Sequence, residues 1–319
     1  MKRIKIERNF EKSCIEESAI ATAGENQTLL KVKSVGICQS DIGRVFNKSA
    51  YYYPIILGHE FAGETIDGRK ATVFPIIPCF GCEECCKENY AQCKNYSYYG
   101  SRQSGGMQQY IPINNWNLIY NDKLDFDELS VIEPSAVAMR SVKYVPSEAK
   151  TILINGCGFI SLVAAQILLS QNKTVYIKNR NQTKLNFALE KFNLIKYNEE
   201  EEVDCAIDFV SNSYSMNYLI QHVSSHGTIV AVGNPAEGVT IDKDNYSKIL
   251  RKELSIVGTW NSRREDWTEV MKLIETKQVD VKSLITNKYN FEDFKIAFEN
   301  IRNNQLTFDK PIIKSILTF

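Results

Sequence analysis

Residues 151–170 read TILINGCGFISLVAAQILLS, and this stretch decides the fold of much of the chain. TILIN has the apolar, branched composition of a buried strand, and FISLVAAQILLS is an apolar run long enough for a helix. A strand that enters a helix through Gly-x-Gly lets the backbone approach a pyrophosphate, which the helix N-terminus then binds. The stretch therefore predicts a dinucleotide site. The expected cofactor contacts in it are Gly156, Gly158, Phe159 and Ile160.

The same alternation of strand and helix continues after this stretch. TVYIK at 174–178, CAIDFV at 205–210 and GTIVAVG at 227–233 are typical of buried strands, and KLNFALEKF at 184–192 of a helix. Strands that alternate with helices indicate a parallel sheet with right-handed crossovers. The third glycine of the dinucleotide fingerprint is replaced by Ser161, whose small side chain is compatible with close helix–strand packing.

The end of the second strand bears on the type of coenzyme. An acidic residue there accepts hydrogen bonds from the ribose of NAD, but this chain has Lys178-Asn179-Arg180. Asn179 and Arg180 are therefore the expected contacts, and we predict a preference for NADP(H) over NAD(H), because Arg180 can bind a 2'-phosphate. The alternative is that Lys178 and Arg180 are simply solvated and that the coenzyme is NAD(H).

The N-terminal part has a different pattern, and 319 residues are more than one core usually serves. Residues 1–125 contain short strands, such as LLKVKSVGIC at 29–38, punctuated by proline and glycine. We expect an α/β protein with a mainly β domain at 1–125 and a Rossmann-type parallel-sheet domain at 126–286. Residues 287–319, with a helix at FEDFKIAFENI and a strand at PIIKSIL, are expected to return to the first domain.

Four cysteines lie close together in PCFGCEECCKENYAQC, at 78–93. Cys79, Cys82, Cys85 and Cys93 have the spacing C-x2-C-x2-C-x7-C, and four thiolates form a closed shell for structural zinc. Cys86 is taken as a spare thiol, because Cys85 keeps the even spacing.

Disulfides and a nucleic-acid-binding zinc ribbon are the alternative interpretations of these cysteines. The chain opens with MKRIKIERNF, which has no apolar leader, and this favours reduced thiols and a cytoplasmic protein. The formal net charge is zero and no basic stripe surrounds the cluster, which argues against nucleic acid. No apolar run is long enough for a membrane span, so no membrane partner is expected.

The stretches Gly58-His59-Glu60-Phe61-Ala62-Gly63 and Cys38-Gln39-Ser40-Asp41, with the four cysteines, resemble the zinc-containing medium-chain alcohol dehydrogenases. The resemblance covers nearly the whole chain and is greatest to the polyol branch. It implies a GroES-like catalytic domain and a second, catalytic zinc held by Cys38, His59 and Glu133. Glu60 would sit behind the metal, and Asp41 would orient His59 by accepting its other ring proton.

This resemblance implies hydride transfer between a nicotinamide cofactor and a polyol or sugar-alcohol phosphate, in a homo-oligomer (dimer or tetramer). Ser40 is the expected first proton carrier, because Gly43 stands where many relatives have a relay histidine. Arg44 and Arg102 are candidates to bind a substrate phosphate. Two alternatives remain: an NADPH-dependent ketose-phosphate reductase, and an inactive, zinc-stabilised binding protein.

Overall fold

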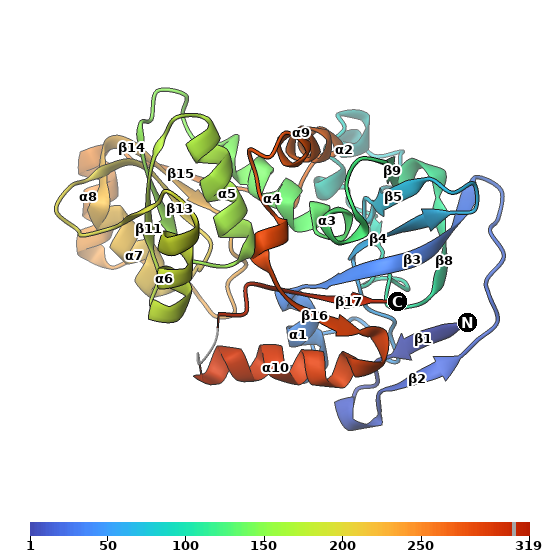
Figure 1. Ribbon diagram of the computed structural model, residues 1–319. Helices are drawn as coiled ribbons and strands as arrows, with labels where there is room; N and C mark the ends of the chain where they lie inside the picture. The colour runs from blue at the N-terminus through green and yellow to red at the C-terminus, as the bar shows by residue number, and fades with distance from the viewer. Residues whose placement is uncertain (308–310) are drawn as a thin grey trace.

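Two sheets organise the molecule (Figure 1). The structure, a computed structural model, describes residues 1–307 and 311–319, with the backbone alone for 305–307. One sheet has six strands in the order β12-β11-β10-β13-β14-β15, and the other has seven strands, of which six follow the order β16-β17-β3-β4-β5-β9 while β8 pairs with β3. The expected combination of a Rossmann-type sheet and a mainly β part is confirmed.

The six-stranded sheet is parallel throughout, and its central strands are buried on both faces. Its strands are β10 (Thr151–Asn155), β11 (Thr174–Lys178), β12 (Ile195–Lys196), β13 (Val203–Asp208), β14 (Val223–Ala231) and β15 (Ser255–Gly258). Its helices are α5 (Phe159–Ser170), α6 (Gln182–Lys191), α7 (Ser213–His222) and α8 (Lys243–Lys252). Ile152 and Ile154 pack with α5 in one core, while Leu153 packs with α7 in another. Successive strand residues thus serve opposite faces, which is why β10 is apolar at three successive positions.

The second sheet forms the core of the other half of the molecule. Its strands are β3 (Gln27–Ile37), β4 (Glu60–Thr65), β5 (Lys70–Val73), β8 (Tyr110–Asn114), β9 (Leu118–Tyr120), β16 (Ile285–Asn290) and β17 (Lys314–Thr318). The helices α1 (Gln39–Phe46) and α10 (Phe294–Thr307) lie beside it. The C-terminal strand β17 pairs antiparallel with β3, with Ser315 opposite Ile37. The two ends of the chain therefore contribute to one sheet, while the exact domain boundaries remain a prediction.

The remaining elements include those of the cysteine lobe and the helices at the junction of the two halves. They are β1 (Lys2–Lys5), η1 (Phe10–Lys12), β2 (Cys14–Glu17), β6 (Ile76–Ile77), α2 (Glu83–Cys86), η2 (Tyr90–Gln92), β7 (Ser97–Tyr98), η3 (Asn115–Asn117), α3 (Phe126–Ser130), α4 (Ile132–Val142), α9 (Arg264–Glu275), η4 (Lys282–Leu284) and η5 (Phe291–Asp293). Helix α4 packs against both α5 and α9, between the two sheets (Figure 1). Trp267 of α9 is fully buried against Phe74, so this junction has an aromatic core.

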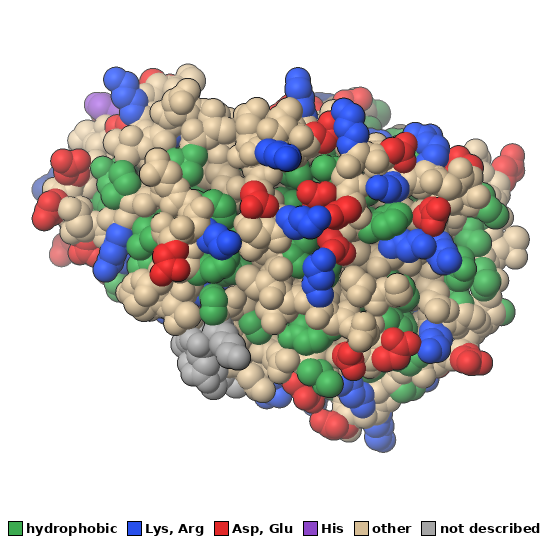
Figure 2. Space-filling view, viewed as in Figure 1, with side chains coloured by type: hydrophobic (Ala, Val, Ile, Leu, Met, Phe, Trp, Pro, Cys, Tyr) green, Lys and Arg blue, Asp and Glu red, His purple; other side chains and the backbone are tan. Residues whose placement is uncertain are grey.

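Charged side chains of both signs are interspersed on the face shown in Figure 2. This agrees with the formal net charge of zero. Among the residues that the structure describes, no helix has the length and apolar character needed to cross a membrane.

Gly58, which precedes the metal-ligand candidate His59, packs its backbone against the backbones of Gly100 and Gly105. A Cβ added to Gly105 would lie 2.2 Å from the carbonyl oxygen of Gly58 and 2.5 Å from the Cα of Gly100. Gly58 and Gly100 themselves have positive φ angles, of 95° and 79°, which favour glycine. The position of His59 thus depends on glycine at three positions distant in sequence.

We predict that Gly105→Ala lowers the stability of the folded protein by about 1–3 kcal/mol, because a methyl group there overpacks against backbone. Gly238→Ala is the matched control, since nothing lies within 4 Å of an added Cβ there. Thermal unfolding of both variants checks the prediction. An unfolding midpoint of Gly105→Ala as high as that of Gly238→Ala would contradict it.

Candidate active site

The four-cysteine lobe brings its sulfur atoms together. Cys79, Cys82, Cys85 and Cys93 offer Sγ atoms that all lie within 4.8 Å of one another. The distance from Cys85 Sγ is 3.5 Å to Cys82 Sγ and 3.9 Å to Cys79 Sγ. Sulfurs about 2.3 Å from a tetrahedral zinc are about 3.8 Å apart, so these residues fit the metal. Cys86 is exposed and is not part of the group.

The backbone of the lobe also favours a thiolate. The pKa of the Cys82 thiol is lowered to about 6, chiefly by a hydrogen bond from the backbone N–H of Cys85 to its sulfur. Metal ligands must be deprotonated, so this hydrogen bond assists binding.

A second group of metal-ligand candidates forms where β3 runs into α1 and where β4 begins. Ligand atoms of Cys38, His59 and Glu60 lie within 4.8 Å of one another. Cys38 is half-buried at the N-cap of α1, while His59 and Glu60 are buried. Glu133 does not belong to this tight group.

Asp41 and Arg44 support this group from helix α1. Asp41 is fully buried, and its Oδ1 lies 3.6 Å from His59 Nδ1, a contact longer than a hydrogen bond. Arg44 Nη1 donates to Asp41 Oδ1 at 3.1 Å and to Ser40 Oγ at 2.7 Å. Asp41 therefore faces His59, but the expected hydrogen bond from the ring is not formed in this structure, and Arg44 holds both Asp41 and Ser40.

Glu60 forms a buried ion pair with Lys314 of β17. A Cβ on Gly36 would lie 2.2 Å from Glu60 Oε2, so the glycine provides the space for this carboxylate. Lys314 Nζ also donates to the carbonyl of Ile37 at 3.2 Å. Burial lowers the pKa of Lys314, but the negative charges of Glu60 and Cys38 raise it by more. The net pKa is therefore above its ordinary value, and the ammonium stays charged.

Glu133, at the start of α4, belongs to a separate chain of hydrogen bonds. Tyr98 donates its phenol proton to Glu133 Oε1 at 3.1 Å, and Asn261 Nδ2 donates to the Tyr98 oxygen at 3.4 Å. Burial, followed by the charge of Glu133, raises the pKa of Tyr98 well above its ordinary value, so the phenol remains a donor. The Tyr98 ring lies 5.8 Å from the His59 ring, which places Glu133 beside the metal-ligand candidates.

The charges of this region suit a divalent cation. When Cys38 is ionised it adds a fourth negative charge to those of Asp41, Glu60 and Glu133, and Arg44 and Lys314 provide two positive charges. With His59 neutral and Glu133 ionised, as metal ligation requires, four minus two leaves two negative charges in a buried space, the charge that Zn²⁺ neutralises. Without a metal, burial lowers the pKa of His59, but the charges of Asp41 and Cys38 outweigh burial and raise this pKa well above its ordinary value, so the imidazole takes up part of this charge. Burial and the nearby Glu60 raise the pKa of Glu133 to about 7, although His59 lowers it, so this carboxylate also gains from a cation.

The glycine turn between β10 and α5 has the geometry that a pyrophosphate requires. Gly156 has a φ angle of 124°, and Gly158 is the N-cap of α5. Ser161, in the third glycine position, is buried and donates to the Gly158 carbonyl at 2.8 Å. The replacement is therefore accommodated locally. Phe159 also lies near the metal group, since its ring centre is 5.4 Å from Lys314 Nζ.

At the adenosine end, Lys178 has an acidic and an aromatic partner within the protein. Lys178 Nζ donates to Glu199 Oε1 at 2.7 Å and lies 3.7 Å from the centre of the Tyr218 ring. Asn179 Nδ2 donates to the carbonyl of Asn181 at 3.2 Å. Arg180 follows directly, and its contact with a 2'-phosphate remains the prediction from the sequence.

The two arginines proposed for a substrate phosphate lie in different environments. Arg44 is half-buried and binds Ser40 and Asp41, as described above. Arg102 is exposed, with its guanidinium 4.1 Å from the centre of the Tyr96 ring and 5.1 Å from that of Tyr51. Arg102 is therefore the better placed of the two.

Sequence reasoning did not find Tyr98, Asn261 or Lys314. Tyr98 and Asn261 are 163 residues apart, and Lys314 meets Glu60 only because β17 returns to β3. No local motif marks these three residues, so only the folded chain identifies them.

The fold and these two sites define a zinc-dependent dehydrogenase. Residues 24–122 match the family model of the alcohol dehydrogenase GroES-like domain, and residues 160–276 match that of the zinc-binding dehydrogenases. The chain belongs to this family and is an oxidoreductase that uses zinc and NAD or NADP. An inactive binding protein is thereby set aside.

Individual relatives are similar in sequence to this chain along most of its length. Galactitol 1-phosphate 5-dehydrogenase of Escherichia coli strain K12 is 27% identical over 320 residues, covering 88% of this chain and 91% of its own. Sorbitol dehydrogenase of Halalkalibacterium halodurans is 24% identical, covering 91% and 93%. The crystal structure of galactitol-1-phosphate dehydrogenase from Escherichia coli superposes with a TM-score of 0.89 at 25% identity, and the comparison covers 100% of both chains.

We predict that Cys93→Ser removes one of two zinc ions per chain and lowers stability by several kcal/mol, because structural zinc contributes folding energy directly. Elemental analysis and thermal unfolding measure the two effects. Cys86→Ser, which changes the exposed cysteine of the same lobe, should keep both zinc ions and the wild-type midpoint. Two zinc ions per chain in Cys93→Ser would refute the assignment.

Proposed function

We propose that the enzyme interconverts an alcohol and a ketone on a polyol or sugar-alcohol phosphate, with a nicotinamide coenzyme. The observation that carries the proposal is a wall of tyrosines that leads from His59 to an exposed arginine. Tyr98 lies next to His59, Tyr96 lies 6.3 Å from Tyr98 by ring centres, and Arg102 stacks on Tyr96. The polyol phosphate specificity of the galactitol 1-phosphate relative supports the same substrate class.

The chemistry of this wall suits such a substrate. Phenol groups donate and accept hydrogen bonds, as hydroxyl-rich chains require, and the guanidinium of Arg102 matches a phosphate with paired donors. A polyol phosphate would then place its carbinol carbon near His59 and its phosphate near Arg102.

Cys38, His59 and Glu133 are our proposed ligands of the catalytic zinc. One thiolate, one imidazole and one carboxylate leave a position open, and the metal supplies Lewis-acid polarisation of the substrate oxygen when bound. Lys314 holds Glu60 by an ion pair behind this set, and Tyr98 orients Glu133. Arg44 holds the hydroxyl of Ser40 and the carboxylate of Asp41, and Asp41 in turn faces the ring of His59 at 3.6 Å.

Ser40 is the proposed first proton carrier. Its oxygen accepts from Arg44, so its own proton can point elsewhere, and its exposure lets water continue the relay that Gly43 cannot.

NADP(H) remains the proposed coenzyme preference. Asn179 presents an amide that does not repel a 2'-phosphate, and Arg180 follows it directly. Lys178 does not contribute, since it pairs with Glu199. Reduction of a ketose phosphate by NADPH is the second candidate direction, and it rests on this preference.

The proposed setting is a cytoplasmic homo-oligomer that acts on small molecules, without a nucleic acid or membrane partner. Strand β15 supports oligomerisation, because it is an edge strand with Ile256 41% exposed and Trp260 following at 53%.

A substrate panel with both coenzymes tests the function. We expect turnover of sugar-alcohol phosphates such as galactitol 1-phosphate to exceed that of ethanol, and Arg102→Ala to raise KM for phosphorylated polyols about 10- to 100-fold, the loss expected for hydrogen bonds to a charged group. Arg69→Ala is the matched control, because Arg69 is also exposed and stacked, 3.7 Å from the centre of the Tyr120 ring. Equal activity on ethanol and polyol phosphates would refute the substrate class.

The coenzyme preference has a test of its own. Asn179→Asp should shift kcat/KM toward NADH by about tenfold or more.

The zinc ligands can be tested by cobalt substitution, because the visible spectrum of cobalt reports its ligand set. We predict that Glu133→Gln weakens metal binding at one site by at least about 10- to 100-fold. Lys314→Met should alter the cobalt spectrum, because Glu60 is released toward the metal, and adding Glu60→Gln should reverse the change.

Lys288→Met, which removes an ammonium that pairs with Asp127 on the surface, is the control and should leave the spectrum unchanged. If Glu60→Gln abolishes binding while Glu133→Gln preserves it, Glu60 is the ligand and the assignment to Glu133 is wrong.

A further inference from the structure

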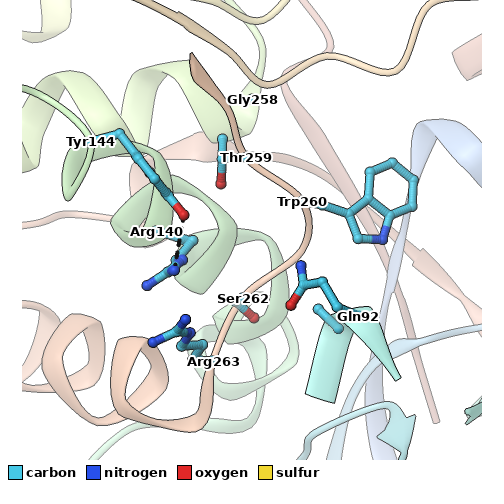
Figure 3. A pocket seen from close by; sticks show the side chains of 9 residues that line it. Gln92, Arg140, Tyr144, Gly258, Thr259, Trp260, Ser262 and Arg263 are labelled. Carbon is cyan, nitrogen blue, oxygen red and sulfur yellow. Dashed lines mark hydrogen bonds between the residues drawn. The ribbon is translucent and has the colours of Figure 1, made fainter. Parts of the chain in front are cut away.

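A cavity of about 230 Å³ lies between α4, the loop from β15 to α9, and the cysteine lobe. Figure 3 shows the side chains that surround it. They come from Ala91, Gln92, Arg140, Tyr144, Gly258, Thr259, Trp260, Ser262 and Arg263. Two of these residues are arginines, and neither belongs to the catalytic or cofactor sites described above.

Arg140 is a nearly buried cation with few partners. Its side chain is only 14% exposed. Nη2 donates to the hydroxyl of Tyr144 at 3.0 Å, and Nη1 lies 3.9 Å from Glu265 Oε1, which is too long for a hydrogen bond. A guanidinium has five N–H donors, and these contacts use one of them.

Arg263 approaches the same space from the start of α9. Its Nη2 donates to Asn89 Oδ1 at 2.5 Å, while Nη1 is again 3.9 Å from Glu265 Oε1. Glu265 is 54% exposed and lies between the two arginines without a hydrogen bond to either. It compensates their charge at a distance but leaves donor positions toward the cavity open.

The other charged side chain nearby, Lys143, pairs with carboxylates of α9. Lys143 contacts Asp266 at 2.8 Å and Glu269 at 2.9 Å, and its distance to Glu265 is 3.9 Å. The two arginines have only Glu265 between them, so one positive charge remains on their side of the group, although the three cations and three carboxylates together sum to zero.

Hydroxyl groups complete the wall. Thr259 Oγ1 is buried and has no hydrogen-bond partner among the described residues. In Figure 3 it points toward the Tyr144 hydroxyl and the Arg140 guanidinium, while Trp260 extends to the opposite side of the loop. An unpartnered buried hydroxyl is costly unless another polar group reaches it.

We propose that this cavity binds a phosphate group through Arg140 and Arg263, with the Thr259 and Tyr144 hydroxyls as further donors. Arginine forks match phosphate oxygens with paired, charge-assisted hydrogen bonds. The volume is several times the roughly 30 Å³ that one water occupies, which is enough for a phosphate. The proposal does not depend on the function proposed above, because binding is measured without turnover.

The same loop connects the cavity to the catalytic region. Asn261 lies between Trp260 and Ser262, and its side chain donates to Tyr98, which in turn donates to Glu133. A phosphate in the cavity would therefore fix one face of a loop whose other face contacts the active site.

The binding test uses the zinc-loaded protein and inorganic phosphate, with sodium chloride at matched ionic strength as reference. We expect a saturable rise of the unfolding midpoint, since a ligand that binds only the folded state stabilises it. Calorimetric titration should show that Arg140→Gln and Arg263→Gln each weaken phosphate binding about 10- to 100-fold. Arg140→Lys should also weaken it, because an ammonium lacks the fork.

Arg251→Gln is the control for net charge, because Arg251 is exposed on α8 and should leave binding unchanged. Absence of saturable binding in the wild type overturns the proposal, including the case in which a second copy of the chain covers the cavity. Equal affinity in wild type and Arg140→Gln overturns it as well.

A kinetic arm identifies the source of the phosphate. If the phosphate belongs to a substrate, inorganic phosphate competes with a polyol phosphate and Arg140→Gln raises KM for that substrate only. If it is a separate anion, inorganic phosphate changes turnover without competing, and the change disappears in Arg140→Gln. Competition that persists unchanged in Arg140→Gln belongs to the substrate's phosphate contact at Arg102, and the proposal is overturned if no effect of inorganic phosphate is then lost in Arg140→Gln.

Discussion

The buried ion pair between Glu60 and Lys314 connects the parts of the molecule on which catalysis depends. Glu60 begins β4, next to His59, and Lys314 begins β17, the last strand of the chain. Lys314 also reaches the carbonyl of Ile37 and lies near the ring of Phe159 at the cofactor turn. A buried pair of this kind is strongly destabilising when one partner is lost, because the other charge is then left uncompensated. The return of the C-terminal segment is thus a requirement of the active site as well as of the sheet.

Two carboxylates near the metal are controlled in different ways. Glu60 is held by a charge, and Glu133 by the phenol of Tyr98. Burial keeps Tyr98 protonated, so its phenol remains available as a donor to the Glu133 carboxylate. The two glutamates can therefore have distinct roles although both lie in the same buried region.

The loop from Gly258 to Arg263 lies at the junction of the molecule's functional parts. Asn261 contacts Tyr98, the Ser262 hydroxyl accepts from the buried Trp267, and Arg263 lies between the cavity of Figure 3 and the cysteine lobe. The structural zinc lobe therefore does more than stabilise its own loop, because it forms one wall of a cavity whose other wall is linked to the catalytic residues.

Much of this protein is determined by its sequence alone. The strand, glycine turn and helix at 151–170, and the spacing of the four cysteines, are local patterns, and the elements they predicted are β10, α5 and the lobe. The short strands β12 and β15 were not predicted, because they are brief and largely exposed and their pairing depends on neighbours across the sheet. The partners of Lys178, Glu60 and Glu133 could not be read from the sequence either, since Glu199 lies in a loop and Lys314 and Tyr98 lie on other strands, and only the fold brings these residues together. Local patterns specify which elements and ligand types exist, whereas tertiary structure decides which charges are paired, and this pairing sets the chemistry of the site.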